Sequence, residues 1–169
     1  VITARMVKRD HPDARIVFIG PCAAKKLEAN RKSVRSDVDF VLTFEELQGM
    51  FDAKDIDFET LEAAPGDDLD EGSAMGRGFA SSGGVAAAVV EAVRHIAPSV
   101  QMKYMAAEGL RDCRKMLMLA KAGKYDGYLL EGMACPGGCV AGAGTIASVR
   151  DGAAAVERFR MQAAEKSTV

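Results

Sequence analysis

Two cysteines in the last third of the chain lie in a stretch whose composition favours metal or redox chemistry. Cys135 and Cys139 are separated by Pro136-Gly137-Gly138, within a run rich in glycine. Small residues in a tight turn allow backbone N–H groups to approach thiolates or a bound cluster. Thiolate ligands select zinc, copper or iron–sulfur clusters rather than magnesium or calcium. We therefore predict a metal site here; the alternative is a flexible turn with free thiols or a disulfide.

A third cysteine follows a short apolar run. Cys22 comes after Ile16-Val17-Phe18-Ile19 and Gly20-Pro21, and it leads into a predicted helix that carries Lys25. The start of a helix stabilises a thiolate, and Lys25 can donate hydrogen bonds to an anionic ligand. A single cysteine after a strand is more often a buried core residue. The prediction for Cys22 therefore depends on its combination with the Cys135 and Cys139 pair.

The segments around these cysteines alternate between strand and helix patterns. Strands are predicted at 16–19, 39–42, 100–106 and 128–130, and helices at 1–9, 43–51, 81–96, 110–122 and 151–165. Thr43 and Glu46 have the spacing of a capping box. The alternation predicts an α/β fold, with a mainly parallel sheet flanked by helices, in a single domain over residues 1–169.

Two finer expectations follow from that fold. The first strand, rich in β-branched residues, is predicted to be buried on both faces. Ligands gather at the carboxyl ends of parallel strands, so Cys22 and Cys135 are expected at one edge of the sheet. Residues 55–80 lose periodicity and predict a long loop, with residues 66–71 facing solvent.

Composition excludes several classes of function. Lys and Arg number 22 and Asp and Glu 24, a formal net charge of −2. This balance does not favour a nucleic-acid partner. No membrane span or signal peptide is predicted, and we expect a cytoplasmic protein.

The cysteine segments resemble two signature motifs of the iron-only (FeFe) hydrogenases. Gly20-Pro21-Cys22-Ala-Ala-Lys25-Lys-Leu-Glu28 is similar to Met-Pro-Cys-x-x-Lys-x-x-Glu, and Glu131-Gly-Met133-Ala-Cys135-Pro-Gly-Gly-Cys139 to Glu-x-Met-Ala-Cys-x-x-Gly-Cys. Residues 39–47 and 79–85 are also similar to the family's segments. The resemblance implies part of the two-lobed catalytic domain of a hydrogenase, which interconverts protons, electrons and molecular hydrogen in the metabolism of an anaerobe.

By this resemblance the site residues take specific roles in the H-cluster. Cys22 and Cys135 would be terminal ligands of a 4Fe-4S cubane, and Cys139 would bridge the cubane to the di-iron subcluster. Lys25 would hydrogen-bond a cyanide ligand. Met133 would pack against the di-iron unit, and Phe79 and Val85 would line its apolar surroundings. The partners implied are an electron carrier such as ferredoxin and an upstream part of the same polypeptide.

The ligand count predicts that this chain is incomplete as a cluster site. A cubane takes four thiolates, and these motifs supply three. In the family the fourth belongs to a Thr-Ser-Cys-Cys-Pro motif, which would precede Val1. We therefore expect a fragment that alone neither holds a complete H-cluster nor turns over hydrogen. Cys113 matches no family ligand and is expected to be structural.

Departures from the family pattern keep two alternatives open. Gly20 stands where the catalytic pattern has Met, and Gly142-Ala-Gly-Thr-Ile146 replaces Gly-Gly-Gly-x-Pro. These changes are more similar to the divergent branch, so the first alternative is a non-catalytic hydrogen sensor or iron–sulfur scaffold. The second is a structural zinc site made by all four cysteines.

Overall fold

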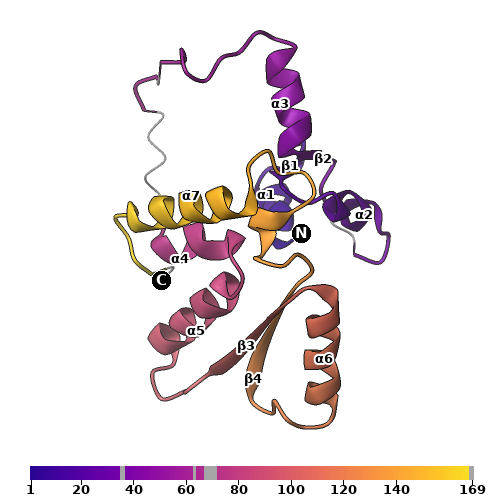
Figure 1. Ribbon diagram of the computed structural model, residues 1–169, viewed down its shortest axis with the longest axis vertical. Helices are drawn as coiled ribbons and strands as arrows, with labels where there is room; N and C mark the ends of the chain where they lie inside the picture. The colour runs from indigo at the N-terminus through magenta and orange to yellow at the C-terminus, as the bar shows by residue number, and fades with distance from the viewer. Residues whose placement is uncertain (35–36, 63, 67–71, 168–169) are drawn as a thin grey trace. The chain divides into compact units, whose positions relative to one another are not determined.

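The computed structural model describes residues 1–34, 37–62, 64–66 and 72–167 (Figure 1). These residues form two compact units, each described here by itself. Unit 1 comprises Val1–Ala63 and Gly142–Ile146, and unit 2 comprises Ala64–Ala141 and Ala147–Val169. A single domain over residues 1–169 stays a prediction.

Unit 1 is built on a parallel pair of short strands. Its elements are α1 (Ile2–Asp10), β1 (Val17–Gly20), α2 (Ala24–Asn30), β2 (Phe40–Thr43) and α3 (Phe44–Asp52). β1 pairs with β2 from Val17 opposite Phe40 to Gly20 opposite Thr43, and α2 lies in the connection between them. The predicted capping box is confirmed: the Thr43 hydroxyl accepts from the Glu46 N–H at 3.2 Å, and the Glu46 carboxylate accepts from the Thr43 N–H at 2.9 Å. β2 therefore ends where α3 begins.

The prediction that β1 is buried on both faces is wrong. Val17, Phe18 and Ile19 are 47%, 37% and 45% exposed, and only Gly20 is buried. Among the described residues β1 has β2 as its single strand neighbour. A run of apolar residues is the same in an edge strand as in a covered central strand, so composition alone did not distinguish them.

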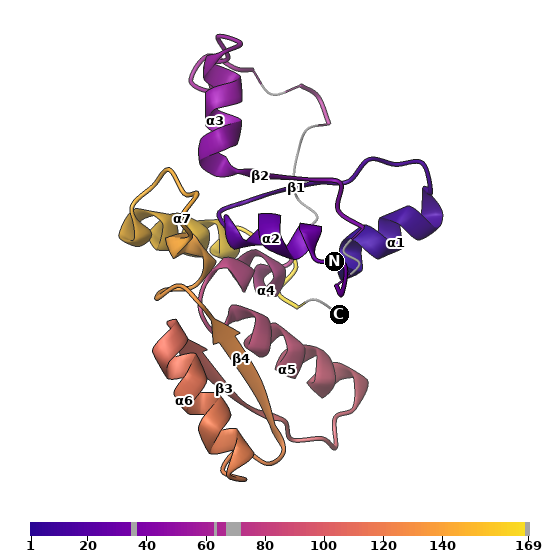
Figure 2. The same cartoon turned by 90° about the vertical axis from the view of Figure 1, so that its right-hand side faces the viewer.

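Unit 2 contains the second parallel pair. Its elements are α4 (Ala74–Arg77), the 3-10 turn η1 (Gly78–Ala80), α5 (Gly84–Ile96), β3 (Lys103–Glu108), α6 (Leu110–Lys121), β4 (Tyr128–Met133), the 3-10 turn η2 (Cys139–Ala141) and α7 (Val149–Met161). β3 pairs with β4 from Lys103 opposite Tyr128 to Glu108 opposite Met133. Figure 1 and Figure 2 show the strand pair between α5 and α6, and each helix contacts both strands. Among the described residues of this unit, the buried side chains are Ala74, Ala86, Ala88, Met116, Val140 and Ala163.

The α/β class with parallel strands and flanking helices is confirmed, but the sheet is divided. Each unit has its own two-stranded sheet, so Cys22 follows β1 of one sheet and Cys135 follows β4 of the other. The expectation that both cysteines lie at the edge of one sheet is therefore wrong. Sequence patterns identify strands but not which strands share a sheet when the connections between them are long.

The predicted loop at 55–80 is also partly wrong, because it contains α4 and η1. The Ser73 hydroxyl accepts from the Gly76 N–H at 3.0 Å and begins α4. A helix of four residues is too short to show apolar periodicity. The acidic stretch predicted to face solvent lies outside the described residues from Asp67 to Glu71. None of the described helices has the length and apolar character needed to cross a membrane.

Candidate metal centre

The loop between β4 and η2 holds Cys135 and Cys139 in a conformation that depends on glycine. Gly137 and Gly138 have φ of +94° and +93°, a region that L side chains rarely adopt. The Gly138 N–H donates to the Cys135 carbonyl at 3.0 Å and closes the turn. Neither cysteine forms a disulfide; Cys135 is half-buried and Cys139 is exposed. The loop thus presents two soft sulfur donors from one tight turn.

A close backbone contact fastens this loop to the segment before α5. Ser81 and Gly138 form an isolated antiparallel bridge. A Cβ at Gly138 would lie 2.6 Å from the Ser82 nitrogen and 2.8 Å from the Ala80 carbonyl oxygen. No larger residue fits there unless the main chain moves. Glycine at this position therefore serves the contact between two segments as well as the turn.

Carboxylates hold the same region at two further points. Glu131 on β4 accepts from the N–H groups of Gly83 and Ala86, each at 2.6 Å. Glu108, the last residue of β3, accepts from the Gly137 N–H at 2.9 Å. The cysteine loop and the start of α5 are therefore joined within unit 2. Nothing in the local pattern around Glu131 predicted this, because its partners are 45 and 48 residues away.

Three other predicted site residues lie on the elements that border this loop. Phe79 is in η1 and 43% exposed, and Val85 is the second residue of α5 and half-buried. Met133 is the last residue of β4 and half-buried, and its carbonyl accepts from the Gly109 N–H at 2.9 Å. Unit 2 thus brings together the segments that carry Phe79, Val85, Met133 and the two cysteines. Contact of their side chains with a cofactor stays a prediction.

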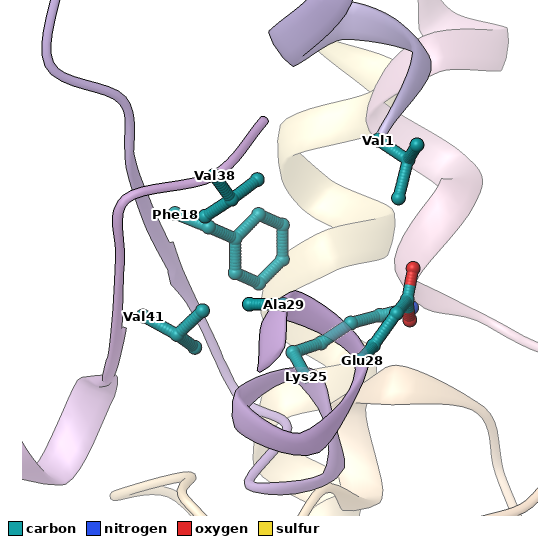
Figure 3. A pocket seen from close by; sticks show the side chains of 7 residues that line it. All are labelled: Val1, Phe18, Lys25, Glu28, Ala29, Val38 and Val41. Carbon is teal, nitrogen blue, oxygen red and sulfur yellow. The ribbon is translucent and has the colours of Figure 1, made fainter. Parts of the chain in front are cut away.

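Cys22 and Lys25 lie in unit 1, at the junction of β1 and α2. The Lys25 N–H donates to the Cys22 carbonyl at 3.1 Å, and the Lys25 ammonium forms an ion pair with Glu28, one turn along α2. The side chains of Lys25 and Glu28 line a pocket of about 120 Å³, together with Phe18, Val41 and others (Figure 3). A lysine has three donors, so Glu28 orients Lys25 and still leaves it able to donate to an anion.

The glycines that follow Cys139 contact the residue before Cys22. Gly142 and Gly144 belong to unit 1, where the Gly144 N–H donates to the Pro21 carbonyl at 2.9 Å. A Cβ on Gly142 would lie 2.2 Å from the Pro21 oxygen, and one on Gly144 would lie 2.4 Å from Cβ of Thr43. The spacing of the glycine-rich run predicted a purpose at the thiolates alone; these contacts were not predictable because nothing in the local sequence identifies the partner segment.

The charged groups beside this contact are well paired. Lys26 donates to the Glu46 carboxylate at 2.8 Å, and this bond, followed by the one from the Thr43 N–H, holds the pKa of Glu46 below its ordinary value. Glu46 therefore stays ionised at neutral pH and keeps the capping box intact.

Cys113 is bonded differently from the other cysteines. It lies on α6, and its Sγ donates to the carbonyl oxygens of Ala107 and Met133, at 3.4 Å each. A thiol that donates a proton is not acting as a thiolate ligand. This agrees with a structural role and disfavours a zinc site that needs all four cysteines.

The donor chemistry fits an iron–sulfur cluster or another thiophilic metal. Cys22, Cys135 and Cys139 supply three thiol groups that are not in disulfides, and a 4Fe-4S cluster is held by cysteine thiolates. In the part of the chain that the structure describes, no three or more His, Cys, Asp or Glu side chains are grouped to hold a metal ion. The roles of these cysteines as ligands stay predictions.

Comparison with protein families decides the relationship. The model of the iron-only hydrogenase large subunit, C-terminal domain, matches residues 1–143. The chain belongs to this family. An FeFe-hydrogenase of Chlamydomonas reinhardtii has the same fold, with a TM-score of 0.61 and 19% identity over 97% of this chain and 57% of that one.

Relatives in this family carry names of two kinds. The periplasmic Fe hydrogenase large subunit of Nitratidesulfovibrio vulgaris is 31% identical over 83% of this chain and 41% of its own length. Cytosolic iron-sulfur assembly component 3 of Bos taurus is 27% identical over 75% of this chain and 34% of its own length. The relatives of this chain thus include proteins named for catalysis and for assembly, and the chain spans less than half the length of either relative.

Proposed function

We propose that this chain is part of an iron-only hydrogenase that carries an H-cluster and interconverts protons, electrons and molecular hydrogen. Cys22 and Cys135 would be terminal ligands of the 4Fe-4S cubane, and Cys139 would join it to the di-iron subcluster. The single observation that carries the proposal is the Cys135 to Cys139 loop, a glycine-dependent turn fastened to the segment that carries Val85. The cofactor, when bound, supplies the redox chemistry and the site of proton reduction.

The residues of this chain would bind and shield that cofactor. Lys25, oriented by Glu28, would donate a hydrogen bond to an anionic ligand such as cyanide. Phe79, Val85 and Met133 would exclude water from the same surroundings. Because Cys22, Lys25 and Met133 lie at or next to the ends of strands and helices, the protein would hold the cofactor in one orientation.

The remaining parts of the machinery would come from outside these residues. We expect an upstream part of the polypeptide to supply the fourth thiolate, a ferredoxin to exchange electrons, and the protein to act in the cytoplasm of an anaerobe. On its own, this chain is expected to hold no complete H-cluster and to show no hydrogen turnover.

Reconstitution with an external thiol tests the ligand set directly. The chain is incubated anaerobically with iron, sulfide and excess 2-mercaptoethanol, which replaces the missing fourth ligand, and iron and sulfide are then counted. We expect about four of each per chain. Cys22→Ala, Cys135→Ala and Cys139→Ala should each lower loading, while Cys113→Ala should not. Loading that depends on Cys113, or on none of these cysteines, would contradict the proposal.

A second function, iron–sulfur assembly or hydrogen sensing without catalysis, is favoured by one observation. Gly20 replaces a methionine of the catalytic pattern, and a Cβ at Gly20 would lie 2.8 Å from the Phe18 ring. The position beside Cys22 therefore has no thioether and an aromatic ring nearby. Hydrogen evolution by the longest polypeptide that contains this chain, with a reduced viologen as donor, separates the two functions. Adjacent cysteines upstream would favour catalysis, and an attached PAS-like or phosphatase domain would favour sensing.

A further inference from the structure

The N-terminus of α5 lacks a cap from its own sequence. Its N-cap residue is Gly83, which has φ of +83° and no side chain, and its first turn contains no acidic residue. The first N–H groups of a helix have no partner within the helix, and they are normally satisfied by a side chain at the N-cap. In unit 2 the carboxylate of Glu131 takes that place.

Glu131 satisfies these donors with both of its oxygens. Its Oε1 accepts from the Gly83 N–H and its Oε2 from the Ala86 N–H, each at 2.6 Å, and its side chain is half-buried. Bonds from N–H groups to a carboxylate are stronger than bonds between neutral groups, and a negative charge is favoured at a helix N-terminus. Because Glu131 is on β4, opposite Ala106 of β3, the carboxylate fixes α5 to the sheet.

The contact between Glu131 and the start of α5 is close in sequence to the cysteine loop and to the bridge that holds it. Glu131 is four residues before Cys135, and Gly83 is two residues after Ser81, which bridges to Gly138 between the two cysteines. Two contacts therefore join the segment Glu131–Gly138 to the segment Ser81–Gly83. One is the Glu131 carboxylate on the Gly83 N–H, and the other is the bridge between Gly138 and Ser81. If the carboxylate is lost, one end opens, and the loop is then held by the Ser81 bridge to Gly138 and by the bond from the Gly137 N–H to Glu108.

We propose that Glu131 is a positioning residue for the Cys135 to Cys139 loop, acting through the start of α5. The inference deepens the proposed function, because the loop it fixes is the one proposed to bind the cluster. It concerns the protein without metal, however, so it can be tested independently. Glu131→Gln is the informative change, since the amide keeps the size but has one oxygen acceptor and turns an N–H donor toward another donor.

Amide hydrogen exchange measured by NMR tests the proposal on the chain itself. In Glu131→Gln we expect exchange to be about ten- to a hundredfold faster at Gly138 and Ala141, whose N–H groups bond within the loop, while α6 amides are unchanged. Alkylation of the half-buried Cys135 should accelerate in parallel, relative to Cys113. Glu131→Asp keeps the charge and should recover part of the protection.

Controls separate positioning from a general loss of stability. Glu157→Gln removes an equivalent charge from unit 2, at an exposed carboxylate paired with Arg160, and should leave the loop amides unchanged. The proposal is overturned if Glu131→Gln accelerates exchange equally throughout unit 2, or only at Gly83 and Ala86. If that variant does not fold, the same test is made on the unaltered protein. The amide exchange rates of Gly83, Ala86 and Gly138 should then increase together as denaturant is added, and independent increases reject the proposal.

Discussion

Gly138→Ala should destabilise unit 2 through a contact that the backbone cannot relieve. The left-handed φ of +93° costs a non-glycine residue about 1–2 kcal/mol. The new Cβ would also lie 2.6 Å from the Ser82 nitrogen, so the bridge to Ser81 must open and lose bonds of about 0.5–1.5 kcal/mol each. The free energy of unfolding should fall by about 2–4 kcal/mol, a decrease in Tm of at least about 10 °C.

Tyrosine fluorescence reports this change selectively. The chain has no tryptophan, and its three tyrosines, Tyr104, Tyr125 and Tyr128, all belong to unit 2. Gly127→Ala is the matched control, because Gly127 has φ of +77° and open space where its Cβ would be. It should show only the cost of the left-handed backbone, about 1–2 kcal/mol. Equal decreases in the free energy of unfolding for Gly138→Ala and Gly127→Ala would refute a role for the close backbone contact at Gly138.

Three further predictions concern other contacts. Gly142→Ala should speed hydrogen exchange in residues 17–43, because its Cβ would lie 2.2 Å from the Pro21 oxygen, whereas Gly49→Ala, which meets nothing within 4 Å, should not. The pKa of Glu46 is lowered, so its ionised carboxylate stabilises unit 1 at pH values above its ordinary pKa of 4.5. This stabilisation is lost as the pH falls through the lowered pKa. Glu46→Gln should therefore flatten the dependence of the same exchange rates on acid. Cys113→Ala should lower the free energy of unfolding, followed by tyrosine fluorescence, by about 0.5–1.5 kcal/mol, because the single S–H shared by the Ala107 and Met133 carbonyls is lost. A decrease in metal loading in this variant would contradict the structural role of Cys113.

Local patterns predicted the elements well because their causes are local. The capping box of Thr43 and Glu46 links residues three apart, and the sequence alone was sufficient to place the start of α3 there. The cap on α5 has the same physical purpose, yet its carboxylate comes from Glu131 on another element. No pattern within a short window distinguishes such a glutamate from a solvated one.

The candidate site shows the same division. The types and spacing of Cys135 and Cys139 predict a soft-metal loop from consecutive residues, and metal binding there stays a prediction. The sequence did not predict which segment each glycine contacts. Gly138 and Gly142 each lie against the backbone of a segment far away in the sequence, where a Cβ would not fit. The prediction that β1 is buried was wrong for a related reason: the residues of a strand do not identify its neighbours.

The order in which unit 1 becomes available during synthesis follows from its discontinuity. Residues up to Ala63 leave the ribosome before the segment Gly142–Ile146 that completes this unit, which emerges roughly 80 residues later. At 5–20 residues per second, that is a delay of about 4–16 s. Throughout it, the Pro21 carbonyl lacks the Gly144 N–H. Residues 17–43 therefore make their final contacts only after most of unit 2 has been synthesised, and a nascent chain halted before Gly142 should remain sensitive to protease over these residues.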